Sequence, residues 1–288
     1  MLAGLILFLG CVDQLDQGVL PHKEEILEVF EGSVETEEIS LDFSTFNGYI
    51  EVNLWSDQAY KVEVTKWARG TTSEEAKENA ENIKVDFSEE ERAGGTVLVL
   101  EIEYVKNAGA YIKAYLPEKS FNTVELSTSN GYIEVDRIEA SDVSLKTSNG
   151  YIEASITADD IDISTSNGRI TGFFQGNEVD IDTSNGEVDI ECGDGGDYTI
   201  NTSNGRIVIE VGSRGEFDIT TSNGSIDITV AGDFTFDLKT SNAQITVDAD
   251  NVTYTVDSKT HKKGSTADDA EVSIAASTSN GTVRVRKR

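Results

Sequence analysis

The stretch Leu126–Val135, LSTSNGYIEV, decides the fold, because the four residues at its centre, TSNG, recur along the chain. The further copies, with the variants TFNG and TSNA, begin at Thr45, Thr147, Thr165, Thr183, Thr202, Thr221, Thr240 and Thr278. Most successive motif glycines lie 18 or 19 residues apart. A fixed period of this length indicates a repeat architecture in which each unit packs on its neighbours.

Each motif is flanked by two runs in which apolar and polar residues alternate. Around the copy at Thr202, Tyr198 and Ile200 precede the motif, and Ile207 and Ile209 follow it. An alternation of period two predicts strands that bury one face. Each repeat therefore predicts two short strands joined at a Ser-Asn-Gly corner.

Two all-β architectures fit this pattern. In the first, Asn-Gly forms a two-residue hairpin turn and the chain is an antiparallel meander. In the second, each repeat is one coil of a parallel β-solenoid. Ala243 stands at a glycine position, which argues against the hairpin because a type I′ turn needs positive φ there, at a cost of about 1 kcal/mol for alanine. We expect the second: a single-chain parallel β-helix with about 18–19 residues per coil, wound right-handed.

The repetition of Thr, Ser and Asn beside the glycine also favours stacked coils. Identical residues of successive coils lie about 4.8 Å apart in a solenoid, so their side chains can hydrogen bond along the stack. The asparagine shares the sequence parity of the inward apolar positions, so we expect an inward-facing ladder, with the glycine leaving room for the bend. Its members are Asn130, Asn149, Asn167, Asn185, Asn204, Asn223, Asn242 and Asn280.

The last repeat is displaced along the sequence. Gly281 follows Ala243 by 38 residues, twice nineteen, and residues 257–271 carry no motif. We expect the coils to stack in sequence order, with 257–271 as an irregular loop that interrupts one of them. The basic segment GTVRVRKR, 281–288, is then an edge strand that its charge protects from further pairing, or a contact for anionic lipids or wall polymers.

A divergent repeat, LDFSTFNGYIEVNLW at residues 41–55, precedes the regular ones. Between them, a helix is expected at about 73–82, where Thr72 and Glu75 are spaced as a capping box. Further strands are expected at 60–68, 83–87, 96–104 and 110–116. The sequence thus predicts a signal-like segment at 1–11, a tether at 12–30, an N-terminal β cap with a short helix at 31–122, and the repeat solenoid at 123–288.

The N-terminal stretch MLAGLILFLGC is apolar but too short to span a bilayer, which takes about 20 residues. It resembles a lipoprotein signal, in which a small residue precedes a cysteine that receives lipid after cleavage. The usual basic residues are missing, and Leu9 is larger than the residue usual at its position. Cys11 is therefore a candidate lipidation site, with an uncleaved apolar segment as the alternative. In either case we expect an exported protein that is anchored at the cell membrane and faces the outside.

The formal net charge is −30, from 53 acidic and 23 basic residues. A nucleic-acid surface needs clusters of Lys and Arg, so no nucleic-acid partner is expected. The acidic side chains are expected to form a solvated surface that limits self-association. The acidic turns at 159–160, 194–197 and 233 permit weak Ca²⁺ binding; no cofactor or dedicated metal site is expected.

Residues suited to catalysis are scarce in this sequence. The two histidines lie outside the repeats, and no phosphate loop, zinc spacing or nucleophile–His–acid arrangement is present. The best carboxylate set for glycan cleavage is Asp160 and Asp162 with Asp180 and Asp182, one repeat apart. Because acidic residues occupy outward positions in most repeats, no catalytic residue is assigned.

Two further groups of residues have an expected place. Cys192 shares the inward column of Phe174, which indicates a buried core thiol. Tyr132 and Tyr151, with Tyr49, are placed to stack on the outer face. Ordinary cross-strand packing and an aromatic ligand platform both fit that stack.

The repeats FSTFNGYIEV, LSTSNGYIEV, LKTSNGYIEA and ISTSNGRITG, with the lead-in YLPEKSFNTVELSTSNG, resemble an adhesin-like family of bacterial and archaeal proteins, a domain of unknown function. The resemblance covers about 30–288. It implies a β-solenoid of envelope or surface proteins, and it supplies no catalytic residue.

These observations together predict a non-enzymatic cell-surface β-solenoid that acts as a structural or adhesive module. Its acidic faces would contact a glycan or protein of the envelope or the extracellular space, and its N-terminal lipid or apolar segment would contact the membrane. Two alternatives are a scaffold that polymerises through its coils and a carbohydrate-active β-helix enzyme.

Overall fold

The computed structural model describes residues 2–3, 7–8, 20–92 and 95–288. Cys11 and residues 12–19 of the expected tether lie outside the described residues. The chain divides into two compact units, Met1–Glu139 and Ala140–Arg288. The coil that carries the first TSNG motif, expected in the solenoid, belongs to the first unit, and each unit is considered by itself.

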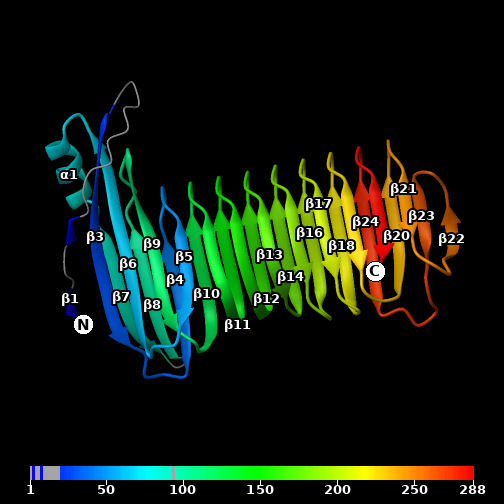
Figure 1. Cartoon of the computed structure of the whole chain (residues 1–288), viewed down its shortest axis with the longest axis horizontal. Coiled ribbons are helices and arrows are strands. Elements are labelled where there is room, and N and C mark those ends of the chain that lie inside the picture. Colours follow the sequence, from blue (N-terminus) through cyan, green and yellow to red (C-terminus); the bar gives the residue numbers. More distant parts are fainter. Residues whose placement is uncertain (1, 4–6, 9–19, 93–94) are drawn as a thin grey trace. The chain divides into compact units, whose positions relative to one another are not determined.

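The first unit contains three coils of parallel strands, and each coil turns at a corner between its two strands (Figure 1). The coils are β4 (Glu38–Ser44) with β5 (Ile50–Trp55), β8 (Gly95–Ile102) with β9 (Ala108–Pro117), and β10 (Ser120–Thr128) with β11 (Ile133–Thr147). They are not stacked in sequence order. The earliest coil, β4–β5, lies between the other two, so that Phe43 pairs with Leu100 on one side and Leu126 on the other.

Antiparallel strands and a short helix close one side of this unit. They are β1 (Leu2–Ala3), β2 (Leu7–Phe8), β3 (His22–Ser33), β6 (Ala59–Gly70), α1 (Ser73–Glu81) and β7 (Val85–Arg92). β6 pairs with β9, β3 pairs with β6, and β1 and β2 pair with β3, while β7 pairs with β8. The predicted β-rich cap with a short helix is confirmed.

The expected tether is shorter than the sequence suggested. Residues 22–30 belong to β3, which pairs with β6 along its whole length. The physical reason is apolar burial: Ile26 is 4% exposed, and the Phe30 ring stacks on Phe87 at 4.5 Å between centroids. A segment that buries apolar side chains against a sheet does not act as a free linker.

The helix α1 begins as its sequence predicted. The Thr72 side chain accepts a hydrogen bond from the Glu75 N–H at 3.1 Å, and α1 packs on β6 and β3 through Ala76 and Ala80, which are fully buried. The Glu75 carboxylate reaches the N–H of Thr71 at 2.7 Å, one residue before the position of a strict capping box.

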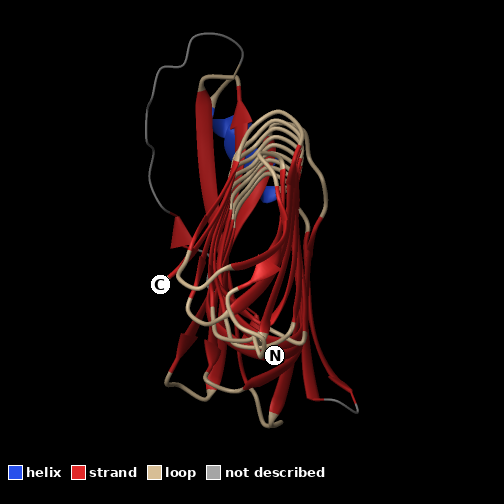
Figure 2. Cartoon of the chain, turned by 90° about the vertical axis from the view of Figure 1, so that its right-hand side faces the viewer, coloured by secondary structure: helices blue, strands red, loops and turns tan. Residues whose placement is uncertain are grey.

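The second unit is a parallel β-solenoid. Its strands are β12 (Ile152–Thr165), β13 (Ile170–Gln175), β14 (Glu178–Thr183), β15 (Val188–Cys192), β16 (Asp197–Thr202), β17 (Ile207–Val211), β18 (Gly215–Thr221), β19 (Ile226–Val230), β20 (Phe234–Thr240), β21 (Ile245–Asp248), β24 (Val272–Thr278) and β25 (Val283–Lys287). All of them pair in parallel without register shifts, and the turns of successive coils nest within one another (Figure 2). The parallel solenoid is confirmed, and the antiparallel meander is excluded.

The prediction that the coils stack in sequence order is wrong at the far end of this unit. β24 pairs with β18 on one side and with β20 on the other, and β25 lies in the same way between β19 and β21 (Figure 1). The basic segment at 281–288 is therefore enclosed by two coils. Its charge suits this place, because Arg284 lies 3.6 Å from Asp227, and Lys287 pairs with Asp233 at 2.6 Å.

Residues 257–271, expected as an irregular loop, are partly a β-hairpin. β22 (Thr253–Asp257) pairs antiparallel with β23 (His261–Ser265), and β23 pairs antiparallel with β20. The hairpin thus covers the outer edge of β20, which would otherwise present unpaired N–H and C=O groups.

The core of the solenoid lies between its two sheets and contains the alternating apolar positions of every strand. The expected place of Cys192 is confirmed: it is buried, in register with Phe174 and Val211. Burial raises the pKa of its thiol, so this cysteine is an inert core residue. Tyr198 stacks on Phe217 at 4.7 Å, and its hydroxyl donates to the carbonyl of Phe174 at 3.2 Å.

Candidate functional site

The TSNG corners are held together by the threonine. At the corners of Thr165, Thr183, Thr202, Thr221 and Thr278 the threonine hydroxyl donates to the glycine carbonyl of the neighbouring coil, as from Thr221 to Gly205 at 3.2 Å, and accepts from the glycine N–H of its own coil, as from Gly224 at 3.1 Å. Both hydrogen-bonding functions of the hydroxyl are therefore used inside the fold. This explains why threonine recurs, which a hairpin turn would not require.

The glycine recurs because the coils approach closely at the corner. A Cβ atom at Gly186 would lie 1.6 Å from the carbonyl oxygen of Gly168, and a Cβ at Gly205 would lie 1.6 Å from that of Gly186. No side chain fits at that distance from a backbone atom. The requirement is space for the neighbouring coil, rather than room for the bend as the sequence suggested.

The asparagine side chains hydrogen bond along the stack, but they face solvent. In the second unit the asparagines stack in the order Asn149, Asn167, Asn185, Asn204, Asn223, Asn280, Asn242, and each amide after the first donates to the side-chain oxygen of the preceding one at 2.7 or 2.8 Å. In the first unit Asn130 donates to Asn47 at 2.7 Å. The expected inward orientation is wrong, because the alternation of the strand ends at the buried threonine and the next two residues turn outward. The ladder stabilises the fold and leaves little amide capacity for a ligand.

An unexpected feature of the second unit is a column of four carboxylates in register. It consists of Asp160, Glu178, Asp197 and Glu216, on β12, β14, β16 and β18. All four side chains are exposed, and neighbours of the column are about 4.8 Å apart along the sheet. We call these four residues the acidic column.

The acidic column has no basic counterpart among the described residues: none of its carboxylates forms an ion pair. On the same face, Lys146 pairs with Asp162 at 2.7 Å. Like charges directly opposite each other on neighbouring strands destabilise a sheet. The column therefore creates a concentrated negative potential that the fold itself does not neutralise.

In the acidic turns considered for Ca²⁺, Asp160 and Asp197 belong to the acidic column, and the other three aspartates have partners within the protein. Asp159 accepts from the Asn177 amide at 2.8 Å, and Asp194 accepts from the Ser213 N–H at 2.5 Å. Asp233 accepts from Lys287. Within residues 20–92 and 95–288, no group of three or more His, Cys, Asp or Glu side chains has the arrangement to hold a metal ion.

The carboxylates singled out for catalysis are register neighbours on an open sheet face. Asp162 lies opposite Asp180, while Asp160 lies opposite Glu178, and Asp182 opposite Ser164. Asp162 is engaged by Lys146. These carboxylates lie on one open strand face. Their arrangement concentrates negative charge there and does not place an acid and a base on either side of a bound substrate.

A row of stacked aromatic rings crosses the first unit. It runs from Trp67 to Tyr111 (6.3 Å), to Tyr49 (4.6 Å) and to Tyr132 (4.7 Å). Lys23 lies over the rings of Trp67 and Tyr111 at 5.1 and 5.2 Å. The three tyrosine rings are nearly parallel, at 8° and 9°, so their faces cover one another. A sugar ring needs an open aromatic face, so this row fits cross-strand packing better than a ligand platform.

The polar edges of the row are also engaged. The Tyr132 hydroxyl donates to Glu51 at 2.6 Å, and Lys113 pairs with the same carboxylate at 2.7 Å. Burial, and then the hydrogen bond to Glu51, raise the pKa of Tyr132, so its hydroxyl remains protonated. Burial also raises the pKa of Tyr49.

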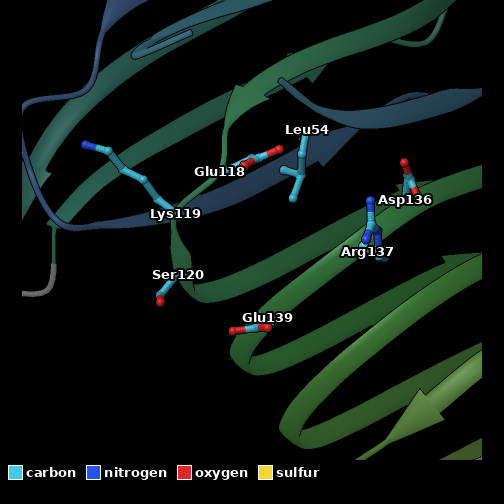
Figure 3. A pocket seen from close by; sticks show the side chains of 7 residues that line it. All are labelled: Leu54, Glu118, Lys119, Ser120, Asp136, Arg137 and Glu139. Carbon is cyan, nitrogen blue, oxygen red and sulfur yellow. The ribbon is translucent and has the colours of Figure 1, made fainter. Parts of the chain in front are cut away.

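A pocket of about 460 Å³ opens on the first unit beside the turn from β9 to β10 (Figure 3). Leu54, Glu118 and Ser120 line it from one side, and Arg137 and Glu139 from the other. Arg137 has φ of 33°, a left-handed backbone conformation that is strained for an arginine. Acidic and basic side chains oppose each other here, so the pocket has no preference for ligands of one charge.

Across residues 20–92 and 95–288 no helix is both long and apolar enough to cross a bilayer.

The fold therefore defines a class: parallel β-solenoids whose corners are stabilised by Thr, Asn and Gly ladders and whose ends are covered by antiparallel strands. A family model described as Toastrack DUF4097 matches residues 36–286, and the chain belongs to that family. The match confirms the resemblance to a domain of unknown function that the repeats indicated.

Three solved structures are similar to this chain at low identity. A proposed adhesin from Bacteroides fragilis is 11% identical with a TM-score of 0.39, and covers 90% of this chain and 96% of its own. A proposed cell adhesion protein from Clostridium sporogenes is 13% identical with a TM-score of 0.26, covering 92% and 100%. A proposed adhesin from Parabacteroides distasonis is 14% identical with a TM-score of 0.29, covering 91% and 97%. No curated protein matches the chain.

Proposed function

We propose that this chain is a non-enzymatic β-solenoid of the cell surface, and that it works by presenting a rigid negative face to a partner. The observation that carries the proposal is the acidic column. Four exposed carboxylates stand in register on a scaffold whose other repeated polar groups bond one another. Such a column contributes nothing to the stability of the fold, so its role lies in contacts outside the molecule.

The partner class suited to this face is a cationic protein segment or a cation-carrying glycan of the envelope or the extracellular space. Contacts between complementary charges would speed association and fix the orientation of the partner. The anchor would be a lipid on Cys11 or the apolar segment before it. Both place the protein at the membrane, facing outward.

The two alternatives have less support. A polymer formed through stacked coils needs open coil edges, whereas β3, β6 and β7 cover the outer coil of the first unit, and β23 covers β20 in the second. A carbohydrate-active enzyme needs an acid and a base around a bound sugar, and the strongest carboxylate set lies on an open face.

Binding to envelope fractions tests the proposal. We would compare the wild type with a variant in which the acidic column is neutralised by Asp160→Asn, Glu178→Gln, Asp197→Asn and Glu216→Gln. A matched control neutralises four exposed acids elsewhere, by Asp57→Asn, Glu101→Gln, Glu153→Gln and Asp250→Asn. Binding by the wild type and the control, but not by the column variant, supports presentation through this face. Equal binding by all three variants contradicts it.

The anchoring part of the proposal has its own test. The wild type is expected in the membrane fraction, accessible to protease added outside intact cells, and Cys11→Ala is expected to move it to the soluble fraction. A wild type that is soluble inside the cell would refute surface presentation, whatever its binding properties.

A further inference from the structure

The coil β24–β25 is enclosed by two coils that precede it in the chain. Its backbone pairs on both sides, over seven residues with β18 and seven with β20. Its corner continues the ladders of its neighbours: the Asn280 side chain donates to Asn223 and accepts from Asn242, each at 2.8 Å. The coil thus occupies a slot between β18–β19 and β20–β21.

The chain around this slot also fits an arrangement without the enclosed coil. Three residues, 231–233, join β19 to β20, and three residues, 212–214, join β17 to β18. Residues 231–233 cross two strand spacings along the stack, about 10 Å, whereas residues 212–214 cross one, about 5 Å. Since three residues can span either distance, the linker also permits β20–β21 to pack directly on β18–β19.

The sequence of β20 suits direct packing as well. Phe236, Leu238 and Thr240 have the same spacing as Phe217, Ile219 and Thr221 on β18, and both sets are buried. The slot can therefore close when the enclosed coil leaves, without leaving an apolar edge exposed to water. This lowers the cost of releasing β24–β25.

The inward side chains of the enclosed coil, among them Ile274, Val283 and Val285, are buried, and its ion pairs at the surface add little. Arg288 lies 3.4 Å from Glu210, where both side chains are exposed, and Lys287 pairs with Asp233, where both are partly exposed. Exposed ion pairs contribute about 0–1 kcal/mol each. One segment, residues 266–271, joins β24 to the preceding hairpin, and no later described element returns to the stack.

We propose that β24–β25 is an exchangeable coil, and that a second copy of this chain is its partner. Each copy places its coil in the slot of the other, which gives a reciprocal dimer with two-fold symmetry. The same backbone pairs and corner ladders then form between chains, so the exchange gains an interface without new contacts. This inference goes beyond presentation of the acidic column and does not depend on it.

Cysteine pairs across the slot test the exchange. Thr220 and Ser277 are register partners on β18 and β24, with hydroxyl oxygens 3.5 Å apart, and strand neighbours at this spacing satisfy disulfide geometry. Full-length chains carrying Thr220→Cys and Ser277→Cys separately, with different tags and Cys11→Ser in both, are co-expressed and oxidised. The proposal expects a disulfide between differently tagged chains, together with a dimer by light scattering.

The matched control uses two positions within the uninterrupted part of the stack. Asn201 and Thr220 are register partners on β16 and β18, so Asn201→Cys and Thr220→Cys on separate chains report chance collisions. A severalfold excess of the 220–277 product over the 201–220 product supports exchange. Equal yields overturn it, as does amide hydrogen exchange in β24–β25 that is as slow as in β16–β17.

Discussion

Each of the two units encloses one coil out of sequence order. In the first, β4–β5 lies between β8–β9 and β10–β11; in the second, β24–β25 lies between β18–β19 and β20–β21. Both units also contain antiparallel strands. The two units differ in how the enclosed coil is connected.

The coil β4–β5 is connected to the cap on both sides. The strand before it, β3, and the strand after it, β6, pair with each other over twelve residues. Among the described residues, β24–β25 is joined to its cap through residues 266–271. An enclosed coil with two packed connections cannot leave its slot without unfolding the cap, whereas a coil with one connection can. Enclosure alone therefore does not determine how tightly a coil is held.

The largest expected effect is a steric clash at the two enclosed corners. A Cβ at Gly48 would lie 1.7 Å from the Ala110 carbonyl oxygen, and a Cβ at Gly281 would lie 1.7 Å from that of Gly224. Gly48→Ala is expected to lower the free energy of unfolding of the first unit by about 4 kcal/mol, because backbone atoms must move. Gly281→Ala is expected to cost less, because β24–β25 can leave the slot.

Urea unfolding of both variants measures the difference between the two corners. Hydrogen exchange should show that protection in Gly281→Ala is lost mainly in β24 and β25. Equal global destabilisation by the two substitutions would contradict the distinction between the two units.

An ion pair with a buried lysine in the first unit and a partly exposed ion pair in the second are expected to contribute differently to stability. The Lys66 side chain is 5% exposed, pairs with Glu28 at 2.5 Å and donates to the Ile83 carbonyl at 3.1 Å. Lys66→Ala leaves Glu28 without its partner and is expected to cost about 3 kcal/mol. Lys287→Ala removes the partly exposed pair with Asp233 and is expected to cost about 1 kcal/mol or less. Thermal unfolding of both variants provides the measurement; similar losses would rule out this contrast.

Acid is expected to loosen the end of the second unit. Partial burial would raise the pKa of Asp237, but hydrogen bonds from Lys239, His261 and Lys263 outweigh it and hold this pKa below its usual range. A lowered folded-state pKa contributes stability that is present above the unfolded value, about 3.9, and is lost as the pH falls through the folded value. Below about pH 4 the β22–β23 hairpin should lose protection in hydrogen exchange.

Asp237→Asn provides the control for this pH dependence. The variant cannot titrate at this position, so its hairpin should be less protected at neutral pH and should change little between pH 6 and pH 3, about the range in which an aspartate titrates. An unchanged acid response in the variant would assign the effect to other carboxylates.

The smallest expected effect lies in the acidic column of the second unit. Asp197→Asn removes one charge from between Glu178 and Glu216 and should stabilise the second unit by about 0.5 kcal/mol at low salt. Added salt should reduce this gain, because it screens exposed charges. Glu153→Gln, beside Thr171, is the matched control and should change stability little. A gain that persists at high salt would not be electrostatic.

The repeat predicted the local structure of the coils well. The threonine and apolar positions are buried, the glycines are the points of closest approach, and the strands are parallel. It could not predict the coil order, because Asn242 and Asn280 lie in nearly identical motifs and either coil fits on Asn223. A repeat specifies the kind of surface that stacks on a coil, but not which copy supplies it.

Other misses have different causes. The asparagine orientation was wrong because strand parity was extended past the point where the strand ends. The aromatic row was only partly foreseen, because Tyr49 and Tyr132 follow motif glycines, whereas Trp67 and Tyr111 lie in the irregular cap. The strained backbone of Arg137 has no signal in its neighbours.

The placement of the tryptophans has a practical consequence for spectroscopy. Trp55 and Trp67, the two tryptophans of the chain, both lie in the first unit, and Trp67 begins the aromatic row. Tryptophan fluorescence should therefore follow the unfolding of the first unit and not that of the second, whereas far-ultraviolet circular dichroism should report the unfolding of both units. Non-coincident curves from the two signals would be the direct sign that the units melt separately.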